Sequence, residues 1–167
     1  YGSIEFLLPE ISVLLNIDRD HLECYKNFDD LKSTFLRFLN KVPFYSFSVA
    51  NYDDENIQSI LPEINKKLIT YGFNSHADVC GYDINPMSSA SEFKVKVNGE
   101  YFSTFTLGLP GMHNISNALA AIATAIHIGV DKEAIVQALK KFKNSERRFQ
   151  ILQDKNVTVV DDYAHHP

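Results

Sequence analysis

Hydrophobic runs alternate with amphipathic stretches along most of this chain. The continuous apolar run at 11–17 is typical of a buried parallel strand. Similar runs at 44–50, 67–73 and 77–84 also indicate strands. Because stretches of helical spacing lie between or after them, the pattern predicts an α/β fold with a mostly parallel sheet.

Two helices are expected in the first half. The apolar residues of 28–41 fall on one helical face: Leu31, Phe35, Phe38 and Leu39. Asp29 or Asp30 is the expected N-cap of this helix. The stretch 53–68 is expected to be helical up to about Leu61, because Pro62 should break or restart the helix.

The second half predicts a hairpin and then two helices. Alternating runs flank Asn98-Gly99, a pair typical of a type I′ turn, so an antiparallel hairpin over 92–107 is inserted in the sheet. A helix from about Asn114 to His127 should end at Gly129, and another should begin after its N-cap, Asp131. Their expected core-facing residues are Ile115, Leu119, Ile122 and Ile126 in the first, and Ile135, Leu139 and Phe142 in the second.

Composition excludes some classes of function. The 167 residues carry a net charge of −5 and no run of Lys or Arg, which argues against nucleic acid as a partner. No apolar stretch is long enough to span a bilayer, so membrane insertion is not expected. Cys24 and Cys80 are far apart, which favours a reduced, cytoplasmic compartment. Both ends read as cut, so a segment of a longer polypeptide is expected.

The loop after the first strand is one candidate site. Asp18, Asp20, His21 and Glu23 lie within six positions and could hold a hard divalent cation bridged to phosphate. In the simpler interpretation, the acidic residues cap the next helix and His21 makes a local hydrogen bond. Spacing alone favours the simpler interpretation.

The stretch PGMHNISNALAAIA at 110–123 is a second candidate. A helix places Asn114, Asn117 and Ala121 on one face, and an Asn amide offers the donor and acceptor that the edge of an adenine ring requires. Gly111 would let the backbone come close, while Ala118, Ala120 and Ala121 would leave room for a flat ring. The alternative is that Asn114 is only an N-cap, which explains neither Asn117 nor His113.

The C-terminal stretch is a third candidate. A linker at 144–156 is expected to lead into a strand within 157–161, followed by the polar cluster DDYAHHP at 161–167. The Arg147-Arg148 pair just upstream could bind phosphate or carboxylate. The alternative for Arg147 is a solvated surface arginine.

Four motifs in this order and spacing resemble the Mur ligases of bacterial cell-wall synthesis: NIDRDHLECY, LPGMHNISNALAAIA, RRF and DDYAHHP. Within that family they match best the ligases that join L-alanine to UDP-N-acetylmuramate. The resemblance implies a central ATP-binding domain over 1–146, and a linker with the start of a C-terminal domain over 147–167. It also implies a cytoplasmic enzyme of peptidoglycan biosynthesis, and hence a role in cell shape and division.

The resemblance also implies roles for individual residues. His21 would bind Mg²⁺ at the γ-phosphate, and His21 and Arg148 would be catalytic. The residues implied to contact ATP are His113, Asn114, Asn117, Arg148 and Asp162, and those implied to contact the substrates are Asn16, Tyr163 and His165. In the mechanism implied, ATP phosphorylates the muramate carboxylate, and the amine of L-alanine attacks the acyl phosphate.

The sequence departs from the family pattern in some respects, and it also allows other functions. The family's glycine-rich phosphate loop is absent from these residues, as are the UDP-binding first domain and most of the last domain, so the segment alone is expected to be inactive. Relatives that add D-glutamate or a murein tripeptide share much of the pattern. A metal-dependent phosphohydrolase would use carboxylates and histidines of the first and third sites, namely Asp18, Asp20, His21, Asp162, His165 and His166. A nucleotide-binding module without catalysis is a further alternative.

Overall fold

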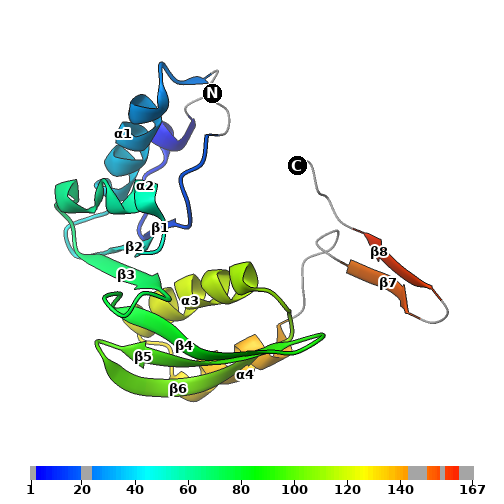
Figure 1. The fold of residues 1–167 in the computed structure, drawn as a ribbon. Helices are drawn as coiled ribbons and strands as arrows, with labels where there is room; N and C mark the ends of the chain where they lie inside the picture. Colours follow the sequence, from blue (N-terminus) through cyan, green and yellow to red (C-terminus); the bar gives the residue numbers. More distant parts are fainter. Residues whose placement is uncertain (1–2, 20–23, 143–149, 155–156, 162–167) are drawn as a thin grey trace.

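Six strands form one mixed sheet in the computed structural model, which describes residues 3–19, 24–142, 150–154 and 157–161 (Figure 1). The strands follow sequence order, β1-β2-β3-β4-β5-β6. Pairing is parallel from β1 to β4 and antiparallel from β4 to β6. Their bounds are β1 Ser12–Leu14, β2 Ser48–Asn51, β3 Leu68–Gly72, β4 Val79–Pro86, β5 Ser91–Val97 and β6 Glu100–Leu107. This arrangement confirms the predicted α/β fold.

The β5–β6 hairpin forms where the sequence predicted it. Asn98 and Gly99 have φ angles of 51° and 83°, the positive values that a type I′ turn requires. Phe93 faces Phe105 across the hairpin, and both side chains are fully buried. The alternation of apolar and polar residues therefore sets the register.

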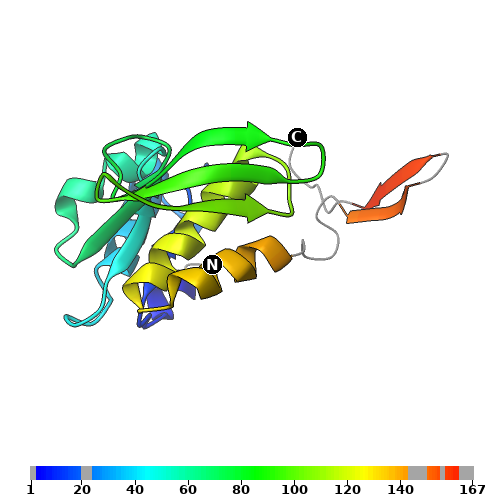
Figure 2. The same ribbon diagram turned by 90° about the horizontal axis from the view of Figure 1, so that it is seen from below.

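Helices cover both faces of the parallel part. Val49 packs in the core beneath α3 (Met112–His127) and α4 (Lys132–Lys141), whereas its neighbour Ala50 packs in a second core beneath α1 (Phe28–Leu39). Since successive side chains of a strand point to opposite faces, β2 is buried on both sides. Figure 2 shows α3 and α4 together on one side of β4–β6.

The N-terminal cap of α1 differs from the prediction. Its N-cap is Asn27, whose side chain accepts a hydrogen bond from the backbone N–H of Asp30, so the expectation of Asp29 or Asp30 was wrong. The two aspartates lie in the first turn, where their charge suits the helix dipole. Leu31 and Leu39 are buried as predicted, and Phe35 and Phe38 pack against the same core.

The 53–68 stretch is less helical than predicted. Asp54 caps the four-residue helix α2 (Glu55–Gln58), which ends before Leu61. A 3-10 turn, η3 (Leu61–Glu63), then contains Pro62 near its start, where the missing N–H of proline costs nothing. Pro62 therefore begins a new turn.

Helix α4 begins as predicted but ends sooner. The Asp131 side chain accepts a hydrogen bond from the backbone N–H of Ala134, which confirms the N-cap. Ile135 is buried and Leu139 packs against the core. Phe142 was expected in the core, but the helix ends at Lys141 and the extended backbone beyond it leaves Phe142 exposed.

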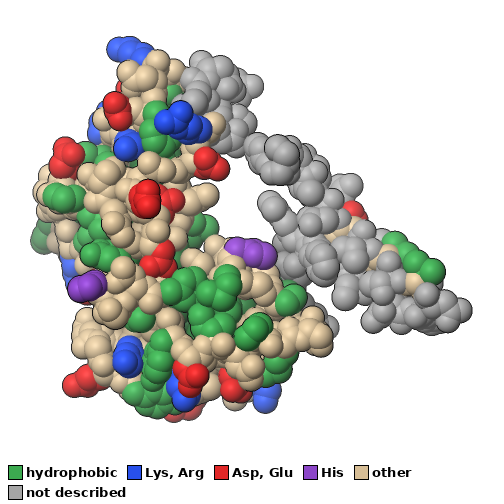
Figure 3. Space-filling model, viewed as in Figure 1, with side chains coloured by type: hydrophobic (Ala, Val, Ile, Leu, Met, Phe, Trp, Pro, Cys, Tyr) green, Lys and Arg blue, Asp and Glu red, His purple; other side chains and the backbone are tan. Residues whose placement is uncertain are grey.

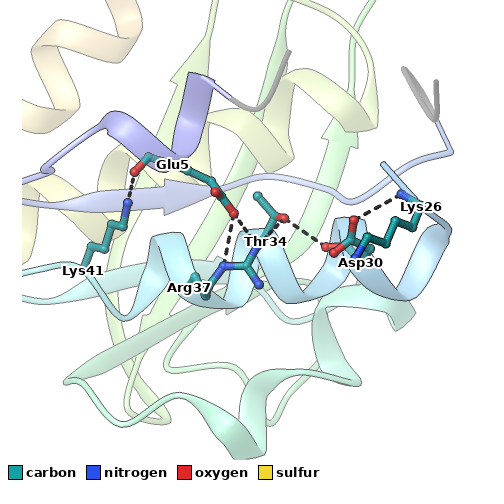
Figure 4. Close-up of polar contacts among 6 residues, drawn as sticks. All are labelled: Glu5, Lys26, Asp30, Thr34, Arg37 and Lys41. Atoms are coloured by element: carbon teal, nitrogen blue, oxygen red, sulfur yellow. Dashed lines mark hydrogen bonds and ion pairs between the residues drawn. The ribbon is translucent and has the colours of Figure 1, made fainter. Parts of the chain in front are cut away.

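A polar network holds the segment before β1 against α1 (Figure 4). The Glu5 side chain, in the 3-10 turn η1 (Ser3–Phe6), accepts hydrogen bonds from the guanidinium of Arg37. Lys41 donates to the Glu5 carbonyl, and Arg37 also donates to Thr34 Oγ1 over 2.9 Å. In the first turn of α1, Asp30 accepts from the backbone N–H of Lys26 over 3.1 Å.

A second, two-stranded sheet lies near the end of the chain. Strands β7 (Gln150–Asp154) and β8 (Thr158–Asp161) pair in antiparallel fashion. The strand predicted within 157–161 is confirmed as β8, while β7 lies in the stretch predicted as a linker. Within the described ranges, no helix is both long and apolar enough to cross a membrane.

Candidate functional site

Helix α3 begins after Gly111. This residue is the N-cap of the helix and has φ of 100° and ψ of 140°, a conformation that side chains of L-residues rarely allow. A Cβ atom added here would also lie 2.9 Å from Cε1 of His113. Gly111 is thus required for the backbone turn, and a Cβ atom at this position would displace the His113 ring.

Asn114 lies inside the first turn of α3. Its Nδ2 donates to the Pro110 carbonyl oxygen over 2.7 Å, and the residue is half-buried. The alternative that Asn114 serves only as an N-cap was therefore wrong, because Gly111 holds that position. One amide N–H of Asn114 is used within the protein, and its Oδ1 accepts no hydrogen bond from any described residue.

An exposed polar stripe follows along α3. His113, Asn117 and Ala121 are exposed, and Asn117 has no hydrogen-bond partner among the described residues. Helical spacing places Asn117 and Ala121 on one face, as predicted, with half-buried Asn114 at its border, and His113 one turn before Asn117 extends that face. The structure therefore brings together three of the predicted polar site residues within two turns of one helix.

The alanines of α3 serve packing more than predicted. Ala118 and Ala120 are buried in the core, so only Ala121 of the three lies on the exposed face. Packing between α3 and β4 is close, since a Cβ atom added at Gly81 would lie 2.8 Å from Cδ1 of Leu119. The expectation that Ala118 and Ala120 leave room for a ring is corrected, because these small residues belong to the buried side of the helix.

Apolar side chains adjoin the α3 region. In Figure 3 the largest group of hydrophobic side chains on the visible face lies over α3 and the neighbouring part of the sheet. Met112, at the start of the helix, is among the exposed hydrophobic residues. A flat, partly apolar ligand ring would find both apolar surface and amide groups beside this helix.

Tyr71 is a buried polar residue beneath α3 that the sequence did not single out. Its side chain is fully buried in β3, and its hydroxyl has no hydrogen-bond partner among the described residues. Burial raises the pKa of Tyr71 far above its usual range. The nearby Ser116 hydroxyl on α3 lowers that pKa, and the charges of Asp53 and Asp54 raise it further. Ser116 is thus a neighbour of the Tyr71 hydroxyl without forming a hydrogen bond to it.

Asn16 lies in a different part of the molecule, in the loop after β1. Its side chain is exposed and has no hydrogen-bond partner among the described residues. The backbone on either side of it, at Leu15 and Ile17, is bonded to side chains of β2 and α2. No hydrogen bond between described residues links this loop to the polar face of α3.

Many of the predicted site residues lie outside the described part of the chain. These are Asp20, His21, Glu23, Arg147, Arg148, Asp162, Tyr163, His165 and His166. Asp18 is described: it is exposed, and its Oδ1 accepts from the N–H of Arg19 over 2.7 Å. Within the described ranges, no group of three or more His, Cys, Asp or Glu side chains could hold a metal ion. Because His21 lies outside the described ranges, the structure does not test the predicted Mg²⁺ site.

Comparison with known proteins agrees with this arrangement. The family model of the Mur ligase middle domain matches residues 2–125. A UDP-N-acetylmuramate–L-alanine ligase from Persephonella marina is 47% identical over 166 residues, which cover 99% of this chain and 35% of that protein. The chain thus spans about a third of the length of this relative.

Solved structures share the fold. UDP-N-acetylmuramate-alanine ligase MurC from Thermotoga maritima superposes with a TM-score of 0.84 at 26% identity, covering 99% of this chain and 37% of that one. MurF from the same organism, solved in complex with ADP, gives a TM-score of 0.74 at 21% identity, over 92% of this chain and 35% of that one. The resemblance predicted from four motifs is confirmed: this chain belongs to the Mur ligase family, and its residues 2–125 match the family's middle domain.

Proposed function

We propose that this chain is the central, nucleotide-binding part of a ligase that uses ATP to join L-alanine to UDP-N-acetylmuramate. The 47% identity to the Persephonella marina ligase supports this substrate pair over those of other family members. In this proposal residues 1–146 form the central domain, and residues 147–167 form the linker and the start of a C-terminal domain. The enzyme would act in the cytoplasm, in the synthesis of peptidoglycan precursors.

The exposed face of α3 is the observation that carries the proposal. Asn117 offers a free amide donor and acceptor, and Asn114 offers an acceptor oxygen fixed by its bond to Pro110. Adenine presents an amino donor and ring-nitrogen acceptors along one edge, which two such amides can read. The ADP held by the MurF structure supports a nucleotide as the ligand of this fold.

The proposed reaction joins a carboxylate to an amine in two steps. The muramate carboxylate oxygen attacks the γ-phosphorus of ATP, the bond to the bridging oxygen breaks, and ADP leaves. The amine of L-alanine then attacks the acyl phosphate, loses a proton, and expels inorganic phosphate to leave an amide. Bound Mg²⁺ would offset the negative charge on the phosphoryl oxygens.

The remaining roles fall on residues outside the described ranges. We assign Mg²⁺ binding to His21, and phosphate or ribose contacts to Arg148 and Asp162. Tyr163 and His165 would line the site of the incoming L-alanine. Asn16 would contact the UDP-sugar substrate, and His113 would border the nucleotide.

The test is ADP release by the full-length protein that contains this chain. The assay holds Mg²⁺-ATP and UDP-N-acetylmuramate constant and offers L-alanine, glycine, L-serine, D-glutamate or the murein tripeptide in parallel. We expect turnover with L-alanine to exceed that with each other acceptor at least tenfold. Preference for D-glutamate or the tripeptide would reassign the enzyme within the family. Phosphate release from ATP or a phosphoester with metal alone, without ligation, would instead support a phosphohydrolase.

The 167-residue chain by itself is a useful control. Its residues lack the glycine-rich loop that cradles the β- and γ-phosphates in this family, so we expect no ligation by the segment alone. Ligation by the segment at a rate near that of the full-length protein would contradict this part of the proposal.

A further inference from the structure

The backbone around Asn16 is held on both sides by side chains from a distant part of the sequence. Asn51, at the end of β2, donates from Nδ2 to the Leu15 carbonyl oxygen over 3.0 Å. The Ile17 N–H donates to Asp54 Oδ2 over 3.4 Å. Asn56 of α2 donates from Nδ2 to the Ile17 carbonyl oxygen over 2.9 Å. We call Asn51, Asp54 and Asn56 the loop bracket.

The loop bracket is itself fixed in place. Asp54 uses its other carboxylate oxygen, Oδ1, to accept from the N–H of Ile57 over 2.8 Å, which caps α2. The Asn51 Oδ1 accepts from the N–H of Asp53 over 3.0 Å. Asp54 thus joins the Asn16 loop to the first turn of α2, and Asn51 joins it to the turn that follows β2.

Apolar packing supports the same alignment. The side chains of Ile17 and Ile57 are buried in one core cluster, so the loop and α2 share a hydrophobic anchor beneath the bracket. Figure 1 shows α2 beside β1 and β2 at this end of the sheet. A loop that is held both by buried apolar contacts and by three hydrogen bonds to its backbone has few backbone conformations open to it.

The Asn16 side chain is left out of this network. Three polar side chains satisfy the backbone next to Asn16, while the Asn16 amide is exposed and has no partner among the described residues. The bond to the Leu15 carbonyl is exposed, so water could replace it at little cost, whereas the two bonds to the Ile17 backbone are partly buried and also stabilise the fold. The contacts hold a free amide at a fixed place at the carboxyl end of β1, the edge where open α/β sheets bind ligands.

We propose that Asn51, Asp54 and Asn56 are positioning residues that hold the Asn16 amide in place to contact the UDP-sugar substrate. This rests on the proposed function, in which Asn16 is a substrate contact. An amide can donate to a phosphate oxygen or accept from a sugar hydroxyl, and either group is present in that substrate. The bracket acts only through Asn16 and touches no substrate.

The test is a double-mutant cycle in the full-length protein, with Asn16→Ala, Asn56→Ala and the double variant. We expect Asn56→Ala to raise the KM for UDP-N-acetylmuramate three- to tenfold and Asn16→Ala to raise it at least as much. The double variant should match Asn16→Ala alone, because Asn56 acts through Asn16. The KM for ATP should change less than twofold in all three variants.

Asn40→Ala is the matched control. Asn40 makes the same kind of contacts, donating from Nδ2 to the Glu63 carbonyl over 3.3 Å and accepting from the Asn65 N–H over 2.9 Å. Asn40 is the C-cap of α1 and Glu63 ends η3, so these contacts precede β2 and β3, on the side of the amino ends of the parallel strands. We expect Asn40→Ala to leave the KM for UDP-N-acetylmuramate unchanged.

Each outcome separates the two proposals. If the wild-type protein ligates but Asn56→Ala leaves that KM unchanged, or its effect multiplies with that of Asn16→Ala, the bracket proposal is wrong and the proposed function stands. If the wild-type protein neither ligates nor binds UDP-N-acetylmuramate in calorimetry, both are wrong.

Discussion

The polar face of α3 and the loop around Asn16 both present exposed amide side chains, but their backbones are held in place in different ways. On α3, a single helix places His113, Asn114 and Asn117, and the longest side-chain contact involved, from Asn114 to Pro110, spans four positions. Around Asn16, the side chains that fix the backbone come from 36 to 39 positions away. A helix carries its own geometry, whereas a loop must borrow its geometry from neighbouring elements.

This difference predicts where each region is vulnerable. The α3 face should fail when the helix is displaced or its start is deformed. The Asn16 loop should fail when a distant hydrogen-bonding partner is removed. Substitutions in and beneath α3 should therefore differ widely in their effect.

Leu119→Ala should have the largest effect. Leu119 is fully buried between α3 and β4, and truncating such a leucine typically costs about 2–5 kcal/mol of the free energy of unfolding. Urea unfolding of the 167-residue chain measures the loss. Ala121→Ser, on the exposed face of the same helix, is the control and should change stability by less than about 0.5 kcal/mol. A loss below about 1 kcal/mol for Leu119→Ala would mean that α3 is not held by this packing.

Gly111→Ala should come next. An alanine must adopt a φ near 100°, and its Cβ would meet the His113 ring, so we expect a loss of about 1–3 kcal/mol in unfolding free energy. The KM for ATP of the full-length protein should rise as His113 and the first turn move. Gly129→Ala is a matched control for strain alone, since it also has positive φ but has open space around its Cβ position. An ATP KM that shifts equally in both variants would contradict a local role for Gly111.

Tyr71→Phe should have the smallest effect and the opposite sign. The buried hydroxyl has no hydrogen-bond partner among the described residues, so removing it should raise the free energy of unfolding by about 1 kcal/mol. Chemical denaturation measures the gain. Tyr101→Phe, at an exposed tyrosine, should be close to neutral. Destabilisation by Tyr71→Phe would reveal a hydrogen bond to this hydroxyl.

Local pattern was enough to predict most of the fold. The β5–β6 hairpin follows from Asn98-Gly99 and flanking alternation, and the cap of α4 follows from Asp131. Boundaries were harder where two residues offer equivalent chemistry. Asn27 and the aspartates after it can all cap a helix, and the choice depends on where the chain leaves extended backbone.

The candidate site could be predicted only in part, for the same reason. Helical spacing placed Asn114 and Asn117 on one face of α3, but it could not show that Ala118 and Ala120 belong to the core, because that depends on which strand packs against the helix. The bracket around Asn16 depends on contacts of the loop after β1 with the end of β2 and with α2, which no local pattern encodes. The polar run NYDDEN, which begins at the last residue of β2, was the available signal for it.

The most direct test of the account is the nucleotide preference of the full-length protein, measured as kcat/KM for ATP relative to GTP. If Asn117 hydrogen-bonds to the adenine edge, Asn117→Ala should reduce that ratio about tenfold. This corresponds to a loss of roughly 1.4 kcal/mol in the free energy that distinguishes ATP from GTP. Asn40→Ala should leave the ratio unchanged. An unaltered ATP-to-GTP ratio in Asn117→Ala, in a protein that still ligates, would contradict the assignment of the α3 face to the nucleotide.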